Sequence, residues 1–84
     1  MKPVELYIKT TCPYCQRALQ LLDDKGVRYS TVNLLQFPER RDEMIERANG
    51  RTTVPQIFIG ETHVGGFDDL NALEKAGKLD ALLA

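Results

Sequence analysis

The sequence predicts an α/β fold in which a four-stranded mixed sheet has helices packed on both faces, in the order β-α-β-α-β-β-α. Two patterns predict it: segments that alternate apolar and polar residues are separated by segments with helical periodicity, and a short turn joins the last two strands. Two strands joined by a helix lie parallel through a right-handed crossover, whereas the final hairpin is antiparallel. The 84 residues make one domain, residues 1–84.

The first half of the chain predicts two strands and two helices. Val4 to Lys9 alternates apolar and polar side chains, as strands do. Pro13 to Lys25 has an apolar stripe at helical spacing, which a glycine ends. Arg28 to Asn33 is rich in β-branched and aromatic residues and predicts the second strand. Pro38 suits the first position of a second helix, which an Asn-Gly pair closes.

The second half predicts a hairpin followed by helices. Gln56 to Ile59 is a short apolar strand, and Thr62 to Val64 is its hairpin partner. Two glycines then lead to a third helix, Phe67 to Ala76, whose leucines face inward. Lys78 to Leu83 predicts a last short helix.

Composition and charge exclude several classes of function. Eleven basic side chains against twelve acidic ones leave a net charge of −1, which gives no electrostatic basis for binding nucleic acid or an anionic membrane. No stretch approaches the roughly 18 apolar residues of a membrane helix, and the N-terminus does not have the pattern of a secretory signal. We therefore expect a cytoplasmic monomer, in a compartment where disulfides are kept reduced.

The two cysteines of the chain, Cys12 and Cys15, lie in the stretch "KTTCPYCQRA" between a predicted strand and a predicted helix. Side chains at this spacing fall on one side of a helix, close enough for a disulfide. A permanent disulfide here would close a very short loop and gain little chain entropy. A C-x-x-C motif beside a βαβ pattern is typical of thioredoxin-like redox proteins, so the sequence predicts thiol–disulfide exchange.

The positions of the two cysteines predict different roles. Cys12 lies at the helix start, with Pro13 at the first helical position, where no N–H is needed. The free amides of the first turn and the positive end of the helix dipole favour a thiolate there, and Lys9 adds a nearby cation. Cys15 lies inside the turn and is less exposed. We predict that Cys12 attacks and that Cys15 resolves the mixed disulfide.

Other uses of the two thiols are less consistent with the sequence. A structural zinc site needs four ligands, and the chain offers two thiols and His63, a side chain that we expect to face solvent. No metal is expected. Two cysteines packed as small apolar side chains would not explain why they lie at this spacing on a helix start. An iron–sulfur cluster shared between two chains stays open.

A second set of residues predicts a binding site for a peptide-like ligand. Pro55 lies at the edge of a strand, where it cannot donate to a neighbour, and it pushes Val54 into an extended conformation. The backbone of Val54 could then pair with an extended ligand. Only about 5–6% of X–Pro bonds are cis, so the sequence alone predicts a trans bond before Pro55.

The stretch "GGFDD" supplies the other half of that site. Gly65 and Gly66 allow a close approach of backbone to ligand, and the amides at the start of the following helix form an anion site. Asp68 or Asp69 can accept from an amine, and Asp68 is also expected to cap the helix. With Lys9 for a second carboxylate, these features suit a small zwitterionic peptide that has two carboxylates, one amine and a central thiol.

Three motifs in this order, "CPYC" at Cys12–Cys15, "TVP" at Thr53–Pro55 and "GGFDD" at Gly65–Asp69, resemble those of the short dithiol glutaredoxins over nearly all of the chain. The resemblance implies a thioredoxin fold, a cis Val54–Pro55 bond, and glutathione as ligand and reductant. Some members carry a further cysteine after the Gly-Gly pair, where this chain has Phe67.

Carried over by position, the resemblance implies that Cys12 forms a mixed disulfide with glutathione, that Val54 pairs with the glutathione backbone, and that Asp68 reaches its amine. Arg40 or Arg41 falls near the glycine carboxylate, and we favour Arg41. The other residues implied to contact glutathione are Lys9, Tyr14, Thr53, Pro55, Gly66 and Phe67.

The implied activity is that of a glutathione-dependent thiol–disulfide oxidoreductase, acting on protein disulfides or glutathionylated proteins, with ribonucleotide reductase as a family-level electron acceptor. Three alternatives remain: a related redoxin reduced by thioredoxin reductase, a carrier of a glutathione-ligated iron–sulfur cluster, and a non-catalytic adaptor. We expect Tyr7 to pack in the sheet, and Arg28, Arg47 and Arg51 to be surface charges.

Overall fold

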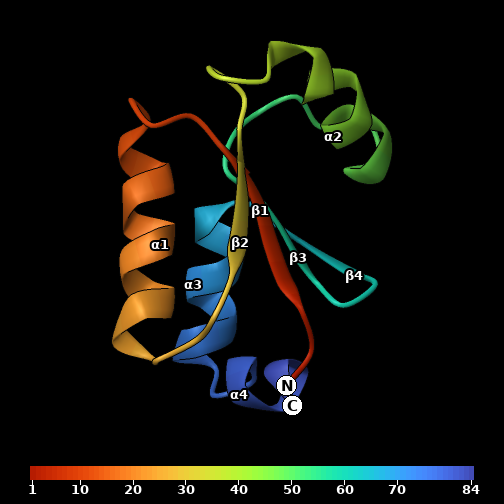
Figure 1. Ribbon diagram of the computed structural model, residues 1–84. Coiled ribbons are helices and arrows are strands. Elements are labelled where there is room, and N and C mark those ends of the chain that lie inside the picture. The colour runs from red at the N-terminus through yellow and green to blue at the C-terminus, as the bar shows by residue number, and fades with distance from the viewer.

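The computed structural model describes residues 1–84 and has one mixed sheet with the strand order β2-β1-β3-β4 (Figure 1). Strands β1 and β2 are parallel, and the pairs β1–β3 and β3–β4 are antiparallel, which confirms the predicted topology. The strands are β1 Val4–Ile8, β2 Ser30–Asn33, β3 Gln56–Ile59 and β4 Thr62–Gly65. The helices are α1 Pro13–Asp24, the 3-10 turn η1 Pro38–Arg40, α2 Arg41–Arg47, α3 Phe67–Lys75 and α4 Leu79–Leu83.

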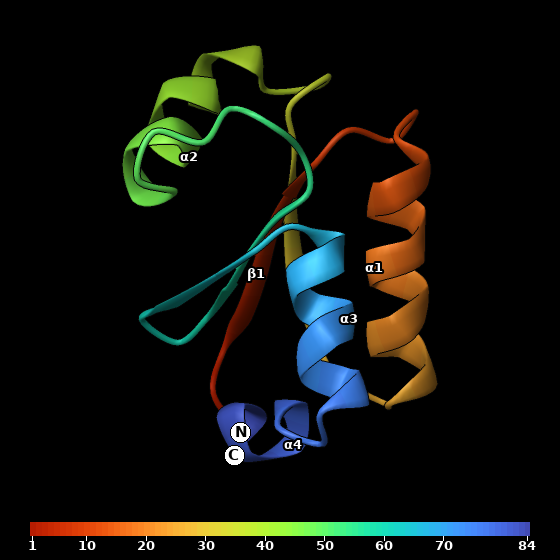
Figure 2. The same cartoon turned by 180° about the vertical axis from the view of Figure 1, so that it is seen from behind.

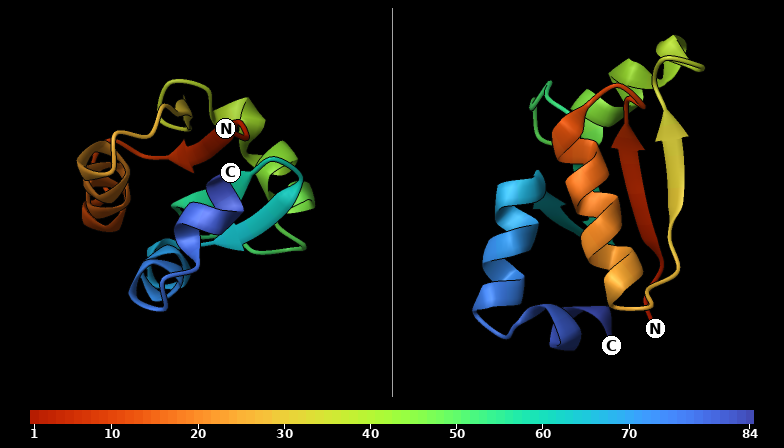
Figure 3. Two further views of the ribbon diagram at one scale, coloured as in Figure 1. Left: turned by 90° about the horizontal axis from the view of Figure 1, so that it is seen from below. Right: turned by 90° about the vertical axis from the view of Figure 1, so that its left-hand side faces the viewer.

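Helices cover both faces of the sheet, as predicted. Helices α1 and α3 lie side by side on one face, and α2 lies on the other (Figures 2 and 3). The core under α1 and α3 includes Leu6, Leu22, Ile57 and Leu70, whereas the core under α2 includes Met44. None of the helices is long and apolar enough to cross a membrane.

Two predicted boundaries differ from the structure. Strand β2 begins at Ser30 rather than Arg28, because the chain is still leaving α1 there: the N–H of Val27 bonds to the carbonyl of Leu22. The segment that begins at Pro38 is first a 3-10 turn, in which the N–H of Arg40 bonds three residues back, and it becomes α-helical at Arg41.

The topology brings three separate segments to one end of the sheet. Strand β1 ends there and leads into the start of α1, while the antiparallel β3 begins there and α3 starts close by. The segments 9–15, 53–56 and 66–69 therefore meet at this end, which is the upper end of the sheet in Figure 1.

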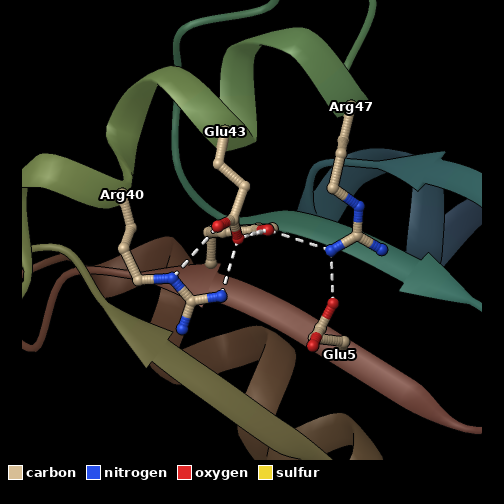
Figure 4. A network of polar contacts seen from close by, with 5 residues as sticks. Glu5, Arg40, Glu43 and Arg47 are labelled. Carbon is tan, nitrogen blue, oxygen red and sulfur yellow. Dashed lines mark hydrogen bonds and ion pairs between the residues drawn. The ribbon is translucent and has the colours of Figure 1, made fainter.

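A network of polar side chains attaches α2 to β1 (Figure 4). The hydroxyl of Tyr7, a fully buried residue, donates to Glu43 and accepts from Arg47 at 2.9 Å. Arg40 donates to the same Glu43 carboxylate at 2.7 Å, and Arg47 also pairs with Glu5. The hydrogen bonds of Tyr7 join residues that are 36 and 40 positions apart in the chain, and they fix α2 over the sheet.

Electrostatics within this network follow from its geometry. Burial, with a smaller contribution from Glu43, raises the pKa of Tyr7, and the adjoining Arg40 lowers the pKa of Glu43. Arg47 is exposed, as predicted, but it is also part of this network. Its guanidinium lies 4.2 Å from the centre of the Phe58 ring, which belongs to the core under α2, and forms a cation–π contact with it.

We expect Tyr7→Phe to lower the free energy of unfolding by about 1–2 kcal/mol, because two hydrogen bonds to charged groups are lost while the ring still packs. Urea unfolding at pH 7 measures this. The matched control is Tyr29→Phe, which removes a single exposed bond to Asp23 and should change stability by less than about 0.5 kcal/mol. Equal losses in the two variants would contradict the role of the network.

Candidate active site

Cys12 lies at the junction of three segments and is the N-cap residue of α1. Its backbone is extended, and Pro13 occupies the first helical position, as predicted. The Cys12 sulfur accepts the N–H of Cys15 at 3.3 Å, and its thiol donates to the carbonyl of Val54 at 3.7 Å. A sulfur in this position receives a first-turn amide that has no partner inside the helix.

Cys15 is buried on the first turn of α1, and both cysteines are free thiols in this structure. Burial, together with the neighbouring Cys12, raises the pKa of Cys15 to about 12, so its sulfur is a protonated thiol at neutral pH. The predicted difference in exposure between the two cysteines is confirmed: Cys12 is half-buried and accessible, and Cys15 lies behind it.

A groove of about 150 Å³ lies beside Cys12. It is lined by Tyr14, Arg51, Thr53, Val54, Pro55, Gly66, Phe67, Asp68 and Asp69. Apart from Arg51, each of these was named above as a candidate contact, with Asp69 as the alternative to Asp68. The rings of Tyr14 and Phe67 lie 6.4 Å apart, so the two aromatic residues lie on the same part of the groove wall.

The other predicted contacts, Lys9 and Arg41, do not line this groove. Lys9 is half-exposed in the loop before α1, and its carbonyl accepts the N–H of Cys12 at 3.0 Å. Arg41 is exposed at the start of α2, whereas its neighbour Arg40 is paired with Glu43.

The peptide bond between Val54 and Pro55 is cis. This agrees with the family resemblance and overturns the trans bond that the base rate of X–Pro bonds favoured. Pro55 is buried just before β3 begins, and the carbonyl of Val54 faces the Cys12 sulfur.

The cap of α3 differs from the prediction. Helix α3 has Gly66 as its N-cap, and the N–H of Gly66 donates to Asp69 at 2.9 Å, so Asp69 and not Asp68 caps the helix. The reason is geometric. Asp69 is the third residue of α3, and a carboxylate at this position reaches back to the N-cap amide, whereas the carboxylate of Asp68, the second residue, does not. The spacing of Asp69 three residues after Gly66 is a signal that could have identified it. Asp68 remains exposed at the groove.

Arg51 is exposed, as predicted, but it is not an isolated charge. Its guanidinium pairs with Asp69 at 3.2 Å and lines the groove. Gly65, at a φ of 116°, leaves the space for this pair, since a Cβ there would collide with both side chains. The hydrogen bond from the N–H of Gly66 lowers the pKa of Asp69, and the hydrogen bond from Arg51 lowers it further by a smaller amount.

His63 also differs from the prediction, because it is only partly exposed. It is half-buried, its ring stacks on Phe58 with the ring centres 5.0 Å apart, and its Nε2 lies 2.7 Å from the side-chain oxygen of Gln56. No three His, Cys, Asp or Glu side chains of the chain cluster as metal ligands would.

A larger hollow, of about 490 Å³, lies between β4, α3 and α4. It contains neither cysteine, and its lining is mostly apolar. The smaller groove is the candidate active site because it adjoins the Cys12 sulfur through Val54.

We expect Asp69→Ala to cost about 1 kcal/mol of stability at pH 7, the usual cost of losing a helix cap, and Asp68→Ala to cost clearly less. The folded-state pKa of Asp69 is lowered, so its contribution is present above the unfolded carboxyl pKa and is lost as the pH falls. Thermal unfolding at pH 7 and pH 3 tests both points. A larger effect of Asp68→Ala, or an Asp69 effect that grows at pH 3, would contradict this assignment.

Comparison with known proteins places these motifs in a family. The model of the glutaredoxin family matches residues 4–64. A glutaredoxin of Pseudomonas aeruginosa is 60% identical over 84 residues, which cover 100% of this chain and 99% of that protein. Glutaredoxin 3 of Escherichia coli K12 is 54% identical over 83 residues, 99% of each chain.

Comparison with solved structures also points to the glutaredoxin family. The buckwheat glutaredoxin–glutathione complex matches with a TM-score of 0.89 at 35% identity, covering 98% of this chain and 76% of that one. The mixed sheet with helices on both faces is thus the thioredoxin fold. With the C-x-x-C pair at the start of α1 and family matches along most of its length, the chain belongs to the glutaredoxin family of thiol–disulfide oxidoreductases.

Proposed function

We propose that the protein is a glutathione-dependent thiol–disulfide oxidoreductase that reduces protein disulfides and protein–glutathione mixed disulfides. The observation that carries the proposal is the accessible Cys12 sulfur beside a groove, with the buried Cys15 thiol behind it. The match to a buckwheat glutaredoxin solved in complex with glutathione supports the choice of ligand.

The groove offers complementary groups along its length. The backbone of Val54 can pair with the cysteine residue of glutathione, next to Cys12. The amides of Phe67 and Asp68 at the start of α3 suit the γ-glutamyl carboxylate, since the N–H of Gly66 already donates to Asp69. Because Asp69 already caps α3, the carboxylate of Asp68 is available to the γ-glutamyl amine.

The remaining contacts supply apolar surface and positive charge. Tyr14, Phe67, Thr53 and Pro55 form the walls on either side of the ligand. Lys9 and Arg41 lie outside the groove lining, and we assign them to the glycine carboxylate at its open end. Arg41 is preferred over Arg40 because Arg40 is held by two hydrogen bonds to Glu43.

In the monothiol mode, the Cys12 thiolate attacks the glutathione sulfur of a glutathionylated protein. The mixed disulfide breaks, the protein thiolate leaves and takes a proton, and a Cys12–glutathione disulfide forms. A second glutathione, as thiolate, attacks the glutathione sulfur and releases oxidised glutathione and free Cys12. Cys15 is not needed in this mode.

In the dithiol mode, Cys12 attacks a protein disulfide and forms a mixed disulfide with the substrate. The Cys15 thiol then attacks the Cys12 sulfur, its proton passes to the departing substrate thiolate, and a Cys12–Cys15 disulfide remains. Two glutathiones reduce this disulfide. The raised pKa of Cys15 keeps it protonated until Cys12 has reacted, so it does not compete for substrate.

Disulfide-containing and glutathionylated proteins are therefore the proposed substrates, with ribonucleotide reductase as one acceptor to test. We propose that the protein works in the cytoplasm, where the glutathione pool can regenerate it.

The test is reduction of a small glutathione mixed disulfide, coupled to NADPH through glutathione reductase. We expect Cys12→Ser to reduce turnover to background, because the attacking sulfur is gone, and Cys15→Ser to retain it, because the monothiol mode needs only Cys12. With a protein disulfide as substrate, Cys15→Ser should lose turnover as well.

Two outcomes would contradict the proposal. An inactive wild type that turns over once thioredoxin reductase replaces glutathione would make thioredoxin reductase the electron donor. Retention of activity in Cys12→Ser would mean that the nucleophile is another group.

A further inference from the structure

We propose that Gln56 and His63 act as a pair of positioning residues that hold the groove wall beside Cys12 and turn the N–H of Val54 toward the substrate. The inference rests on the proposed function, since it concerns the same groove. Neither residue lines the groove itself: Gln56 contacts the lining residue Thr53, and His63 contacts Gln56.

Gln56 is a fully buried polar side chain at the start of β3. Burial of a primary amide is costly unless both of its ends are hydrogen-bonded. Its Nε2 donates to the carbonyl of Thr53 at 2.9 Å and lies 3.3 Å from the Thr53 hydroxyl. These contacts occupy the nitrogen end with acceptors on a single groove residue.

His63 completes the other end of the amide. Because the Gln56 nitrogen faces Thr53, the Gln56 oxygen faces the Nε2 of His63, at 2.7 Å, and must accept from it. His63 therefore carries a proton on Nε2, whether its ring is neutral or charged. Stacking on Phe58 fixes the plane of the ring, so the Nε2 of His63 stays directed at the Gln56 oxygen.

The flipped amide would be incompatible with the groove wall. With its oxygen toward Thr53, Gln56 would face the carbonyl of Thr53 with another acceptor, and that hydrogen bond would be lost. The Thr53 carbonyl therefore selects the orientation in which the Gln56 nitrogen faces it, and the N–H of His63 satisfies the amide oxygen that is left.

Holding Thr53 has a consequence for the next residue. The C=O and N–H of a planar trans peptide unit point in opposite directions. Gln56 draws the carbonyl of Thr53 toward the protein interior, so the N–H of Val54 in the same peptide unit points away from it. That N–H has no backbone acceptor in the protein, and Val54 lines the groove. It is the donor that the ligand backbone would use.

The experiment measures the apparent KM and kcat for a glutathione mixed disulfide in wild type, Gln56→Leu and His63→Phe. Leu fills the volume of Gln without its donors, and Phe keeps the ring on Phe58 without the N–H. We expect both variants to raise KM by about 5-fold, the effect of weakening one hydrogen bond, with kcat changed less than about 2-fold. The matched control is Gln20→Leu on α1, whose amide is exposed and bonds only to Asp24.

Three further readouts separate positioning from general loss of structure. The double variant Gln56→Leu/His63→Phe should raise KM no further than either single change, because both act through one link to Thr53. His63→Gln, which restores an N–H donor, should recover part of the affinity. The rate at which iodoacetamide alkylates Cys12 should stay at the wild-type value, since that reagent does not use the groove.

A KM within 2-fold of the control in His63→Phe, or additive effects in the double variant, would overturn the inference about the pair. The wild-type assay keeps this separate from the proposed function: an inactive wild type would refute the glutathione-dependent function, whereas an active wild type with unchanged variants would refute only the positioning role.

Discussion

The hydrogen bond from the N–H of Cys15 to the sulfur of Cys12 is the interaction on which the chemistry of this protein depends. It exists because α1 begins at Pro13, which needs no acceptor for its nitrogen, and because Cys12 is extended at the N-cap position. The same turn that exposes Cys12 buries Cys15. One helix start therefore makes two cysteines chemically different although they are three residues apart.

The groove beside Cys12 depends on long-range contacts rather than on one motif. Strand β3 runs antiparallel to β1, which brings Val54 to the Cys12 sulfur, and α3 starts on the far side of the groove. Asp69 accepts from the N–H of Gly66, the N-cap residue of α3, and pairs with Arg51, and the Gln56 amide holds Thr53. Each wall of the groove is thus held by a side chain behind it. Asp69, at the end of "GGFDD", holds the α3 side, and Gln56, directly after "TVP", holds the Thr53 side.

The sequence predicts the mixed sheet and the different exposure of the two cysteines because these follow from local patterns, namely alternation and helix starts. Most of the groove lining follows from the resemblance carried by "CPYC", "TVP" and "GGFDD". It does not predict the tertiary partners of polar side chains. Arg47 and Arg51 are exposed as predicted, but their partners and the partial burial of His63 were not predicted, because nothing in the neighbouring residues along the chain shows what lies across the sheet. The cis bond before Pro55 likewise came from the family resemblance and not from the residues themselves.

The most direct test of the account is an amide chemical-shift map of Cys15→Ser, free and with glutathione disulfide-bonded to Cys12. We predict the largest changes in the N–H signals of Val54 and of Gly66 to Asp68, with little change around the hollow between β4 and α4. Changes confined to the first turn of α1, with Val54 and Gly66 unmoved, would show that glutathione is attached at Cys12 but does not lie in this groove. That result would contradict the assignment of the groove as the glutathione site.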